Sequence, residues 1–489
     1  MSITTALSES RFDARTRRSW TPTFRNWFFL ISALTLSAPF LLRAWFIASV
    51  PDIQPFDEDA FCRMEIPLDQ NAFTYYRKAG RLAEGVLADR KADNREMPIE
   101  FMVETMDEVV ASGWIAANEW LKGWCQDYRK SLDEWRKGTE LSDACYLSPR
   151  EIAFKVDVTN QFPVLNQARH FARLARFEGL RLESEGELAE AKGWYMAIFR
   201  CGRHFTRHAF NLQRMTGSAL HAAASASLVR WAEDSQVTQD QLQTALREVQ
   251  IADQMTDSIS STFKAEYLLA SNTLNNRGWL QSMESDYDHE RGSEPAKTLT
   301  SIALWLVGEP QTTQRVLRQI LSNQLSEIDK PLFEQQPQVD LTNTALFQPD
   351  QKLPEKPNQL GPVELNQAVS RLMITRILVP SPQSFEQLTG LATRDQARQV
   401  ALEIGLAAQA YQRENGEFPE DSAAIVPKFL DQWPTDPFSL TGQPMQYRRE
   451  NKTSATVWSV GPNGNDDNGE VTYTEQQPAK DLGIALKSR

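Results

Sequence analysis

The feature that most constrains this chain is an apolar segment near its N-terminus, Trp27–Val50, in which Arg43 is the one charged residue. About 20 residues of helix cross the hydrocarbon core of a bilayer, and an arginine near one end of such a helix can extend its guanidinium to the headgroups. Pro39 interrupts the apolar run, but membrane helices tolerate proline. We therefore predict a transmembrane helix at residues 27–50.

Two other interpretations of this segment are a cleaved signal peptide and a buried core helix. A signal peptide has an apolar region of about 7–15 residues, which this segment exceeds. In addition, Pro39 directly follows the best small-residue cleavage site, Ser37–Ala38. We therefore expect an uncleaved signal anchor.

The charges on the two sides of the segment predict its orientation. Residues 1–26 carry a net charge of +3, which leaves −15 for the rest of a chain whose total is −12. Because basic residues flank the cytoplasmic end of membrane helices, we expect residues 1–26 to be a cytoplasmic tail and nearly everything after residue 50 to lie outside. The charged residues are Glu9, Arg11, Asp13, Arg15, Arg17, Arg18 and Arg25 before the segment, and Asp52, Asp57, Glu58 and Asp59 after it.

Composition excludes some classes of protein. At 489 residues the chain is long enough for two or three domains, and its acidic balance argues against nucleic-acid binding, which favours a basic patch. The four cysteines allow two disulfides in three pairings, or free buried thiols, but they are too few for a disulfide framework. They are Cys62, Cys125, Cys145 and Cys201, all beyond the apolar segment.

Residues 51–326 are predicted to form a helical domain, an irregular bundle or solenoid. Within Val164–Asp234, alanines repeat at helical spacing, which indicates amphipathic helices with close neighbours. Residues 172–203 resemble one tetratricopeptide unit, although no second copy follows at a period of about 34 residues. The residues at matching positions are Gly179, Gly186, Ala191 and Tyr195.

Helical patterns also cover Asn71–Lys137, Thr238–Met255, Ser258–Met283 and Pro295–Ser326. We expect core packing for the tryptophans of the first of these ranges, Trp114, Trp120, Trp124 and Trp135. Between the helical stretches, Glu140–Pro163 contains Pro149 and Pro163 and is expected to be a connection.

The C-terminal third is expected to begin with a linker at residues 327–362, which holds six prolines and many Gln and Asn. Residues 363–489 then form a helix at about 363–378, a long helix at Thr393–Glu414 and a small module with strands at Gln446–Arg449 and Thr456–Val460. The predicted fold is therefore mainly α, with a small α+β module at the C-terminus.

Three short signatures follow one another in residues 397–475. A helix ends in Asn415, Gly416 and Pro419; a turn follows at Asp436, Pro437 and Phe438; and Ser459, Gly461, Asn463 and Gly464 come last. In this order they resemble the C-terminal domain of the major pseudopilin of bacterial type II secretion. The resemblance implies a pseudopilin-like module on the outer side of the bacterial inner membrane. The first 50 residues show no pseudopilin cleavage signal, so processing and fibre formation are not implied.

The loop Asn463–Glu470 is the first candidate site. Calcium prefers six to eight oxygen ligands, which carboxylates, amides and backbone carbonyls supply. The resemblance implies a structural calcium ion in this region, whereas a plain β-turn requires the same Asn, Asp and Gly residues. The candidate ligands are Asn463, Asn465, Asp466, Asp467 and Glu470.

Two further clusters fall in the helical hairpin and the residues beside it. His204 and His208 are spaced to share a helix face, near His170 and His221, but no H-E-x-x-H motif supports a zinc site. Six arginines line two helix faces that could converge into a groove for phosphate or carboxylate, or could be a solvated face paired with glutamates. They are Arg169, Arg173 and Arg176 on one helix, and Arg200, Arg203 and Arg207 on the next.

These observations predict a membrane-anchored extracytoplasmic scaffold that binds other envelope proteins, with a link to type II secretion or envelope assembly. The first alternative is a receptor for an anionic envelope ligand that binds in the arginine groove. A metal-dependent hydrolase is a distant third, because no catalytic motif is present and no catalytic residue is expected.

Overall fold

The computed structural model describes residues 22–63, 65–93, 108–155, 163–275, 302, 305–306, 308–336, 382–471 and 480–488. These residues are mainly helical, and a small sheet lies at the C-terminus, as predicted. The helices are α1 (Pro22–Ala48), α2 (Glu58–Cys62), α3 (Ala72–Ala92), η1 (Trp114–Ala116), α5 (Glu119–Asp127), α6 (Arg129–Thr139), α7 (Pro149–Lys155), α8 (Pro163–Ser184), α9 (Leu188–His204), α10 (Asn211–Ala232), α11 (Gln239–Asp253), α12 (Ile259–Asn275), α15 (Gln311–Glu327), η3 (Leu332–Glu334), α17 (Pro382–Asn415) and η7 (Ser422–Ala424). The strands are β1 (Gln446–Asn451), β2 (Ser454–Ser459) and β3 (Leu482–Lys487).

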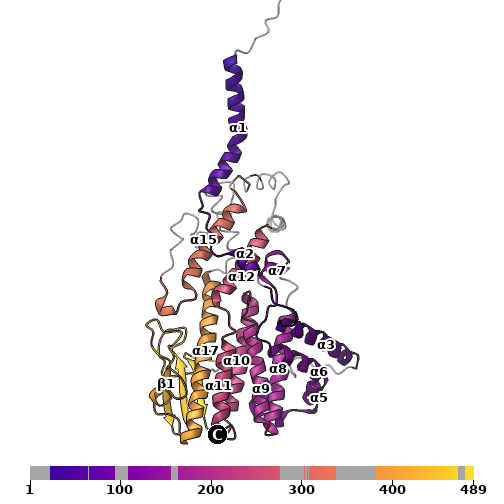
Figure 1. The fold of residues 1–489 in the computed structure, drawn as a ribbon, viewed down its shortest axis with the longest axis vertical. Coiled ribbons are helices and arrows are strands. Elements are labelled where there is room, and N and C mark those ends of the chain that lie inside the picture. Colours follow the sequence, from indigo (N-terminus) through magenta and orange to yellow (C-terminus); the bar gives the residue numbers. More distant parts are fainter. Residues whose placement is uncertain are drawn as a thin grey trace, which may run out of the picture.

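Helix α1 projects from one end of the body (Figure 1). Its segment Asn26–Ala48 is long and apolar enough to cross a membrane, and most of its large apolar side chains are exposed. The helix predicted here, with a length and apolar composition that suit a membrane span, is confirmed.

Hydrogen bonds and ion pairs hold the C-terminal end of α1 against α15. Arg315 donates from Nη1 to the carbonyl oxygens of Ile47, at 2.7 Å, and Val50, at 3.0 Å. These carbonyls lie at the end of α1, where no further turn of helix supplies N–H donors. Arg315 and Arg318 also pair with Asp52.

Helices α8 to α11 and α17 run side by side through the body (Figure 1). Helix α9 lies at the centre, and its run from Trp194 to Phe199 is buried on all faces. Helices α8 and α9 form the predicted hairpin, and Gly179 lets them approach closely. A Cβ at this position would lie 2.3 Å from the ring of Tyr195.

Helices α3, α5 and α6 cover the outer side of α8 and α9. Trp124 and Trp135 are buried there, as predicted, and the Trp124 and Trp120 rings are stacked. Residues 140–163 were predicted to be a connection without a helix, and this prediction is wrong at Pro149–Lys155, which form α7. Ser148 and Glu151 form reciprocal hydrogen bonds before its first turn, and Pro149 suits the first helical position because it needs no N–H donor there.

The C-terminal residues pack onto the body through α17, which contacts α10 and α11 on one side and the sheet on the other. The sheet has the order β1-β2-β3 and is antiparallel throughout. Buried side chains of α17, β2 and β3 belong to the same hydrophobic core as those of α8 to α11. Strand β3 was not predicted. Helix α17 ends at Asn415, and Gly416 follows with φ of +78°, the left-handed conformation that ends many helices.

The residues after α15 also pack against the C-terminal module. Phe333 of η3 lies close to Gly442, since a Cβ on that glycine would be 3.6 Å from the phenyl ring. The rest of the expected linker, residues 337–362, and the expected helix at 363–378 lie outside the described residues.

All four cysteines are free thiols. Burial raises the pKa of Cys125, Cys145 and Cys201 to about 12, which makes these thiols unreactive near neutral pH.

Candidate functional site

A cavity of about 510 Å³ lies where the body meets the C-terminal module. Segments far apart in the sequence form its wall: the start of α12, the residues after α15, the middle of α17 and the turn at 435–437, together with single residues of α9, α10 and α11. The wall combines apolar side chains with charged ones. The apolar residues are Ile259, Ile328, Pro331, Leu332, Phe333, Ala392 and Pro437, and the charged residues are Arg203, Arg214, Asp253, Asp257, Asp329, Lys330, Asp395 and Asp436.

A buried ionic cluster joins four helices at this cavity. Arg203 of α9 is 1% exposed and forms ion pairs with Asp395 of α17, at 2.5 Å, and with Asp253 of α11, at 2.9 Å. His221 of α10 contacts the other oxygen of Asp395 through Nδ1, at 2.7 Å. Gln399, one turn after Asp395, accepts a hydrogen bond from Arg203 at 3.1 Å.

The charges of the cluster follow from its burial. Burial opposes ionisation of Asp395, but His221 and Arg203 outweigh it and hold the pKa of Asp395 well below its usual range. Burial and the neighbouring Arg203 lower the pKa of His221, so the imidazole is neutral. In that state Nδ1–H donates to Asp395, and Nε2 accepts from Arg203 at 3.0 Å. The cluster is thus one guanidinium paired with two carboxylates, and a neutral histidine bridges Arg203 and Asp395.

Arg214 is the second buried arginine of the wall. Its guanidinium donates to the carbonyl oxygens of Asp257 and Ser258 and to the hydroxyl of Thr262. These groups lie around the start of α12, where Asp329 accepts a hydrogen bond from the backbone N–H of Ser260. The polar groups of the wall are therefore largely engaged with one another, and they fix the shape of the cavity.

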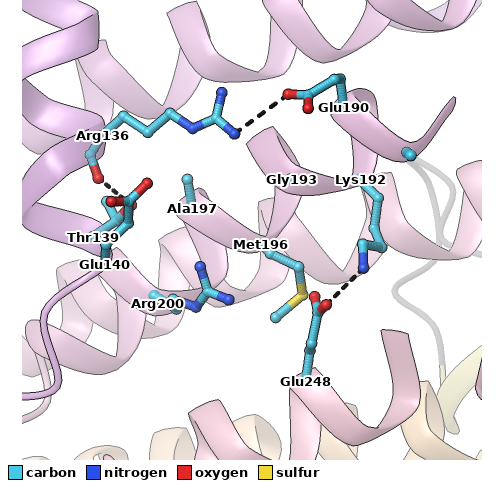
Figure 2. A pocket seen from close by; sticks show the side chains of 11 residues that line it. Arg136, Thr139, Glu140, Glu190, Lys192, Gly193, Met196, Ala197, Arg200 and Glu248 are labelled. Carbon is cyan, nitrogen blue, oxygen red and sulfur yellow. Dashed lines mark hydrogen bonds and ion pairs between the residues drawn. The ribbon is translucent and has the colours of Figure 1, made fainter. Parts of the chain in front are cut away.

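A second, smaller hollow of about 220 Å³ lies between α6, α9 and α11 (Figure 2). Arg136 pairs with Glu190 at 3.6 Å, and Lys192 with Glu248 at 2.8 Å. Arg200 projects into the hollow between these pairs, and it forms no hydrogen bond or ion pair within the described part of the chain.

The six arginines predicted to line one groove have different surroundings. Arg203 is buried in the ionic cluster, Arg207 pairs with Asp143 at 3.1 Å, and Arg169 donates to Asn166 and Thr216. Of the six, Arg200 lines the smaller hollow and Arg203 the larger cavity. Neither hollow is lined by Arg169, Arg173 or Arg176.

The histidines are used in packing and hydrogen bonding. His204 contacts the Tyr76 hydroxyl through Nδ1 at 2.6 Å and the Leu141 carbonyl through Nε2 at 2.9 Å, so both of its ring nitrogens are occupied. The backbone N–H of His208 donates to Asp257 at 2.7 Å, and His170 lies among aromatic rings. No three His, Cys, Asp or Glu side chains among the described residues converge to hold a metal ion.

The loop proposed for calcium is organised by Asp481, which the sequence did not point to. The Asp481 carboxylate accepts hydrogen bonds from the backbone N–H groups of Asp467, Gly469 and Glu470. Asp466 accepts from the indole of Trp458.

Three other predicted ligands of this loop, Asn463, Asp467 and Glu470, also bond to nitrogen donors. Asp467 accepts from the Asn463 amide, Asn463 accepts from the backbone of Asn465, and Glu470 pairs with Lys480. With these oxygens accepting from N–H groups, the loop is closed by its own hydrogen bonds, and calcium binding stays a prediction.

Two of the three C-terminal signatures, the turn at 436–438 and the segment that begins at Ser459, lie in contact. The carboxylate of Asp436 accepts from the Ser459 hydroxyl at 2.6 Å and from the Val460 backbone at 2.8 Å. This contact ties the turn at 436–438, part of the cavity wall, to the end of β2.

The fold and these sites define a mainly helical protein with one N-terminal helix able to cross a membrane and a mixed polar and apolar cavity beside its C-terminal sheet. Comparisons of the chain with family models, curated proteins and solved structures found no match.

Proposed function

We propose that the protein is a single-pass, membrane-anchored scaffold that binds a segment of another envelope protein in the cavity between its body and its C-terminal module. The observation that carries the proposal is the exposed apolar helix α1, whose end is clamped to the body by Arg315. The acidic residues after α1 and the arginines before it favour a cytoplasmic N-terminus and an extracytoplasmic body.

The lining of the cavity supports a protein segment as the ligand. A peptide presents apolar side chains together with polar backbone groups, and the wall offers both kinds of partner. The ionic cluster of Arg203, His221 and Asp395 keeps the two sides of the cavity together, so the site is preformed. Phe333 lies at the cavity and is 40% exposed, which suits an anchor for a bound segment.

Photo-crosslinking in the native membrane tests this function. A photoreactive amino acid at Phe333 is expected to capture a discrete envelope protein, whereas the same probe at Ile115, which is 92% exposed and lies in η1, is not. Capture of a secretin or of pseudopilins would support a role in type II secretion. Equal capture at both positions, or none at Phe333, would contradict the proposed docking site.

A receptor for a small anionic ligand is the second candidate, and Arg200 favours it. A guanidinium that lines a hollow and has no partner among the described residues is available to a carboxylate or phosphate. We expect Arg200→Ala to abolish the binding of such a probe, measured by titration calorimetry with inorganic phosphate and with citrate. Arg247→Ala, at an exposed position of α11, is the control. If the wild-type protein binds neither probe, this candidate fails.

A further inference from the structure

A second apolar surface lies beside α1 and belongs to the body. Ile302 is 50% exposed and Trp305 is 38% exposed, and both precede α15 in the chain. Trp305 lies against α1 itself, because its ring meets Phe40 edge-on with 5.3 Å between centroids. The body therefore presents large apolar side chains next to a helix that is able to cross a membrane.

The contact with Phe40 gives the depth of this surface along α1. Phe40 precedes the end of the helix at Ala48 by about two turns, which at 1.5 Å per residue is about 12 Å. Trp305 thus lies level with residues inside the apolar run. If α1 spans a bilayer, Trp305 cannot be in bulk water, because it lies beside a part of α1 that is still within the apolar layer.

Arg43 shows how the junction accommodates a charge at that depth. Its guanidinium lies over the Trp305 ring, at 5.2 Å from the centroid, and donates to the carbonyl oxygens of Trp305 and Glu309 and to the side chain of Gln311. A cation satisfied by carbonyl groups and an indole face is the arrangement expected at a membrane interface, where tryptophan is also enriched.

We propose that Ile302 and Trp305 form a second membrane contact, inserted at the boundary between headgroups and acyl chains of the outer leaflet, so that the body lies on the membrane. This inference rests on the proposed membrane anchoring by α1. Its ligand is the lipid surface: acyl chains contact Ile302 and the Trp305 ring, while Arg43 keeps its own hydrogen bonds to the body.

Site-specific fluorescence in lipid nanodiscs tests the inference on the full-length protein. Single cysteines at Ile302, at Leu34 in α1 and at Ile251 in α11 would carry an environment-sensitive NBD label in a Cys62→Ser background. Of the other native thiols, Cys145 and Cys201 are buried and Cys125 is half-buried, and the raised pKa of all three, about 12, makes them unreactive near neutral pH. Ile251 is the matched control, because it is apolar and 65% exposed but belongs to α11, a helix of the body away from α1 (Figure 1).

We expect lipids with a nitroxide near the headgroup to quench the label at Ile302 and at Leu34, and aqueous iodide to quench only the label at Ile251. If Leu34 is protected but Ile302 behaves like Ile251, the second membrane contact is refuted while the anchor stands. If Leu34 is itself open to iodide, membrane anchoring fails as well. Protection of Ile302 from both quenchers would indicate cover by protein and would also overturn the proposal.

Discussion

Nδ1 of His221 lies 2.7 Å from Oδ1 of Asp395, although 174 residues separate them in the chain. His221 belongs to α10 in the centre of the body, and Asp395 belongs to the long helix that carries the C-terminal sheet. With Arg203, they bind the C-terminal module to the body through a buried ionic contact. The module is thus held in place by the core, which is why the cavity beside it has a fixed wall.

Asp395→Asn is expected to destabilise the protein strongly. The substitution leaves the buried guanidinium of Arg203 without its closest carboxylate, and breaking a buried ion pair costs about 3–5 kcal/mol. Urea unfolding followed by circular dichroism measures the loss. Glu420→Gln, at a largely exposed carboxylate, is the control and should change the unfolding free energy by less than about 1 kcal/mol. A similar small effect for Asp395→Asn would show that the cluster does not hold α17 in place.

Stability should fall as the pH is lowered from 6.5 towards 4. Burial lowers the pKa of both His170 and His204 from 6.5 to about 4. The folded state therefore favours the neutral imidazole, and the stabilisation is fully present above the unfolded pKa and lost as the pH falls. By pH 5 the loss is about 2 kcal/mol per histidine. Urea unfolding at pH 7.5 and pH 5 tests this, and His204→Asn should reduce the slope; a flat profile in the wild-type protein would contradict it.

Arg315→Ala is expected to release the end of α1 from α15. The variant loses two hydrogen bonds to carbonyl oxygens and an ion pair with Asp52, and charge-assisted hydrogen bonds contribute about 1.5–3 kcal/mol each. Hydrogen–deuterium exchange should become faster in residues 45–52, with α8 and α9 unchanged. Arg247→Ala serves as the control for loss of an exposed arginine. Unchanged exchange at residues 45–52 would mean that other contacts fix the junction.

The C-terminal loop gives a test of calcium binding. Because the side chains of Asn463, Asp466, Asp467 and Glu470 accept from N–H groups or pair with lysine, we expect the melting temperature of the full-length protein to be the same in millimolar calcium and in a chelator. A higher melting temperature in calcium would show that the loop rearranges to bind the ion. Asp481→Ala should lower the melting temperature in both conditions, since it leaves three backbone donors without an acceptor.

Local sequence signals predicted some helices well, and α11 is an example. Helix α11 was expected at Thr238–Met255, and Thr238 indeed forms a capping box with Gln241. Helix α7 was missed because Pro149 was interpreted as a breaker, although proline is favourable at the first position of a helix. Strand β3 was missed because six residues at the end of the chain carry too little pattern, and its pairing with β2 depends on contacts across the sheet.

The candidate site was the least predictable part. Arg203 was singled out from the sequence, but as one of six similar arginines on two helix faces. Its partner Asp395 is 192 residues away, and no motif marks it or Gln399. The cavity is made where segments meet after folding, so it has no signature in any single stretch. The same holds for Asp481, whose role depends on a loop that begins well before it in the chain.

The clamp between Arg315 and the end of α1 has a mechanical consequence. A flexible linker would let the body move through a wide volume above the membrane, and any partner would meet it in many orientations. Because hydrogen bonds hold the junction, α1 and the body change their tilt together as one rigid unit. If α1 spans a bilayer as proposed, the angle of α1 sets the height and direction in which the cavity opens, so membrane thickness itself would govern which partners come within reach.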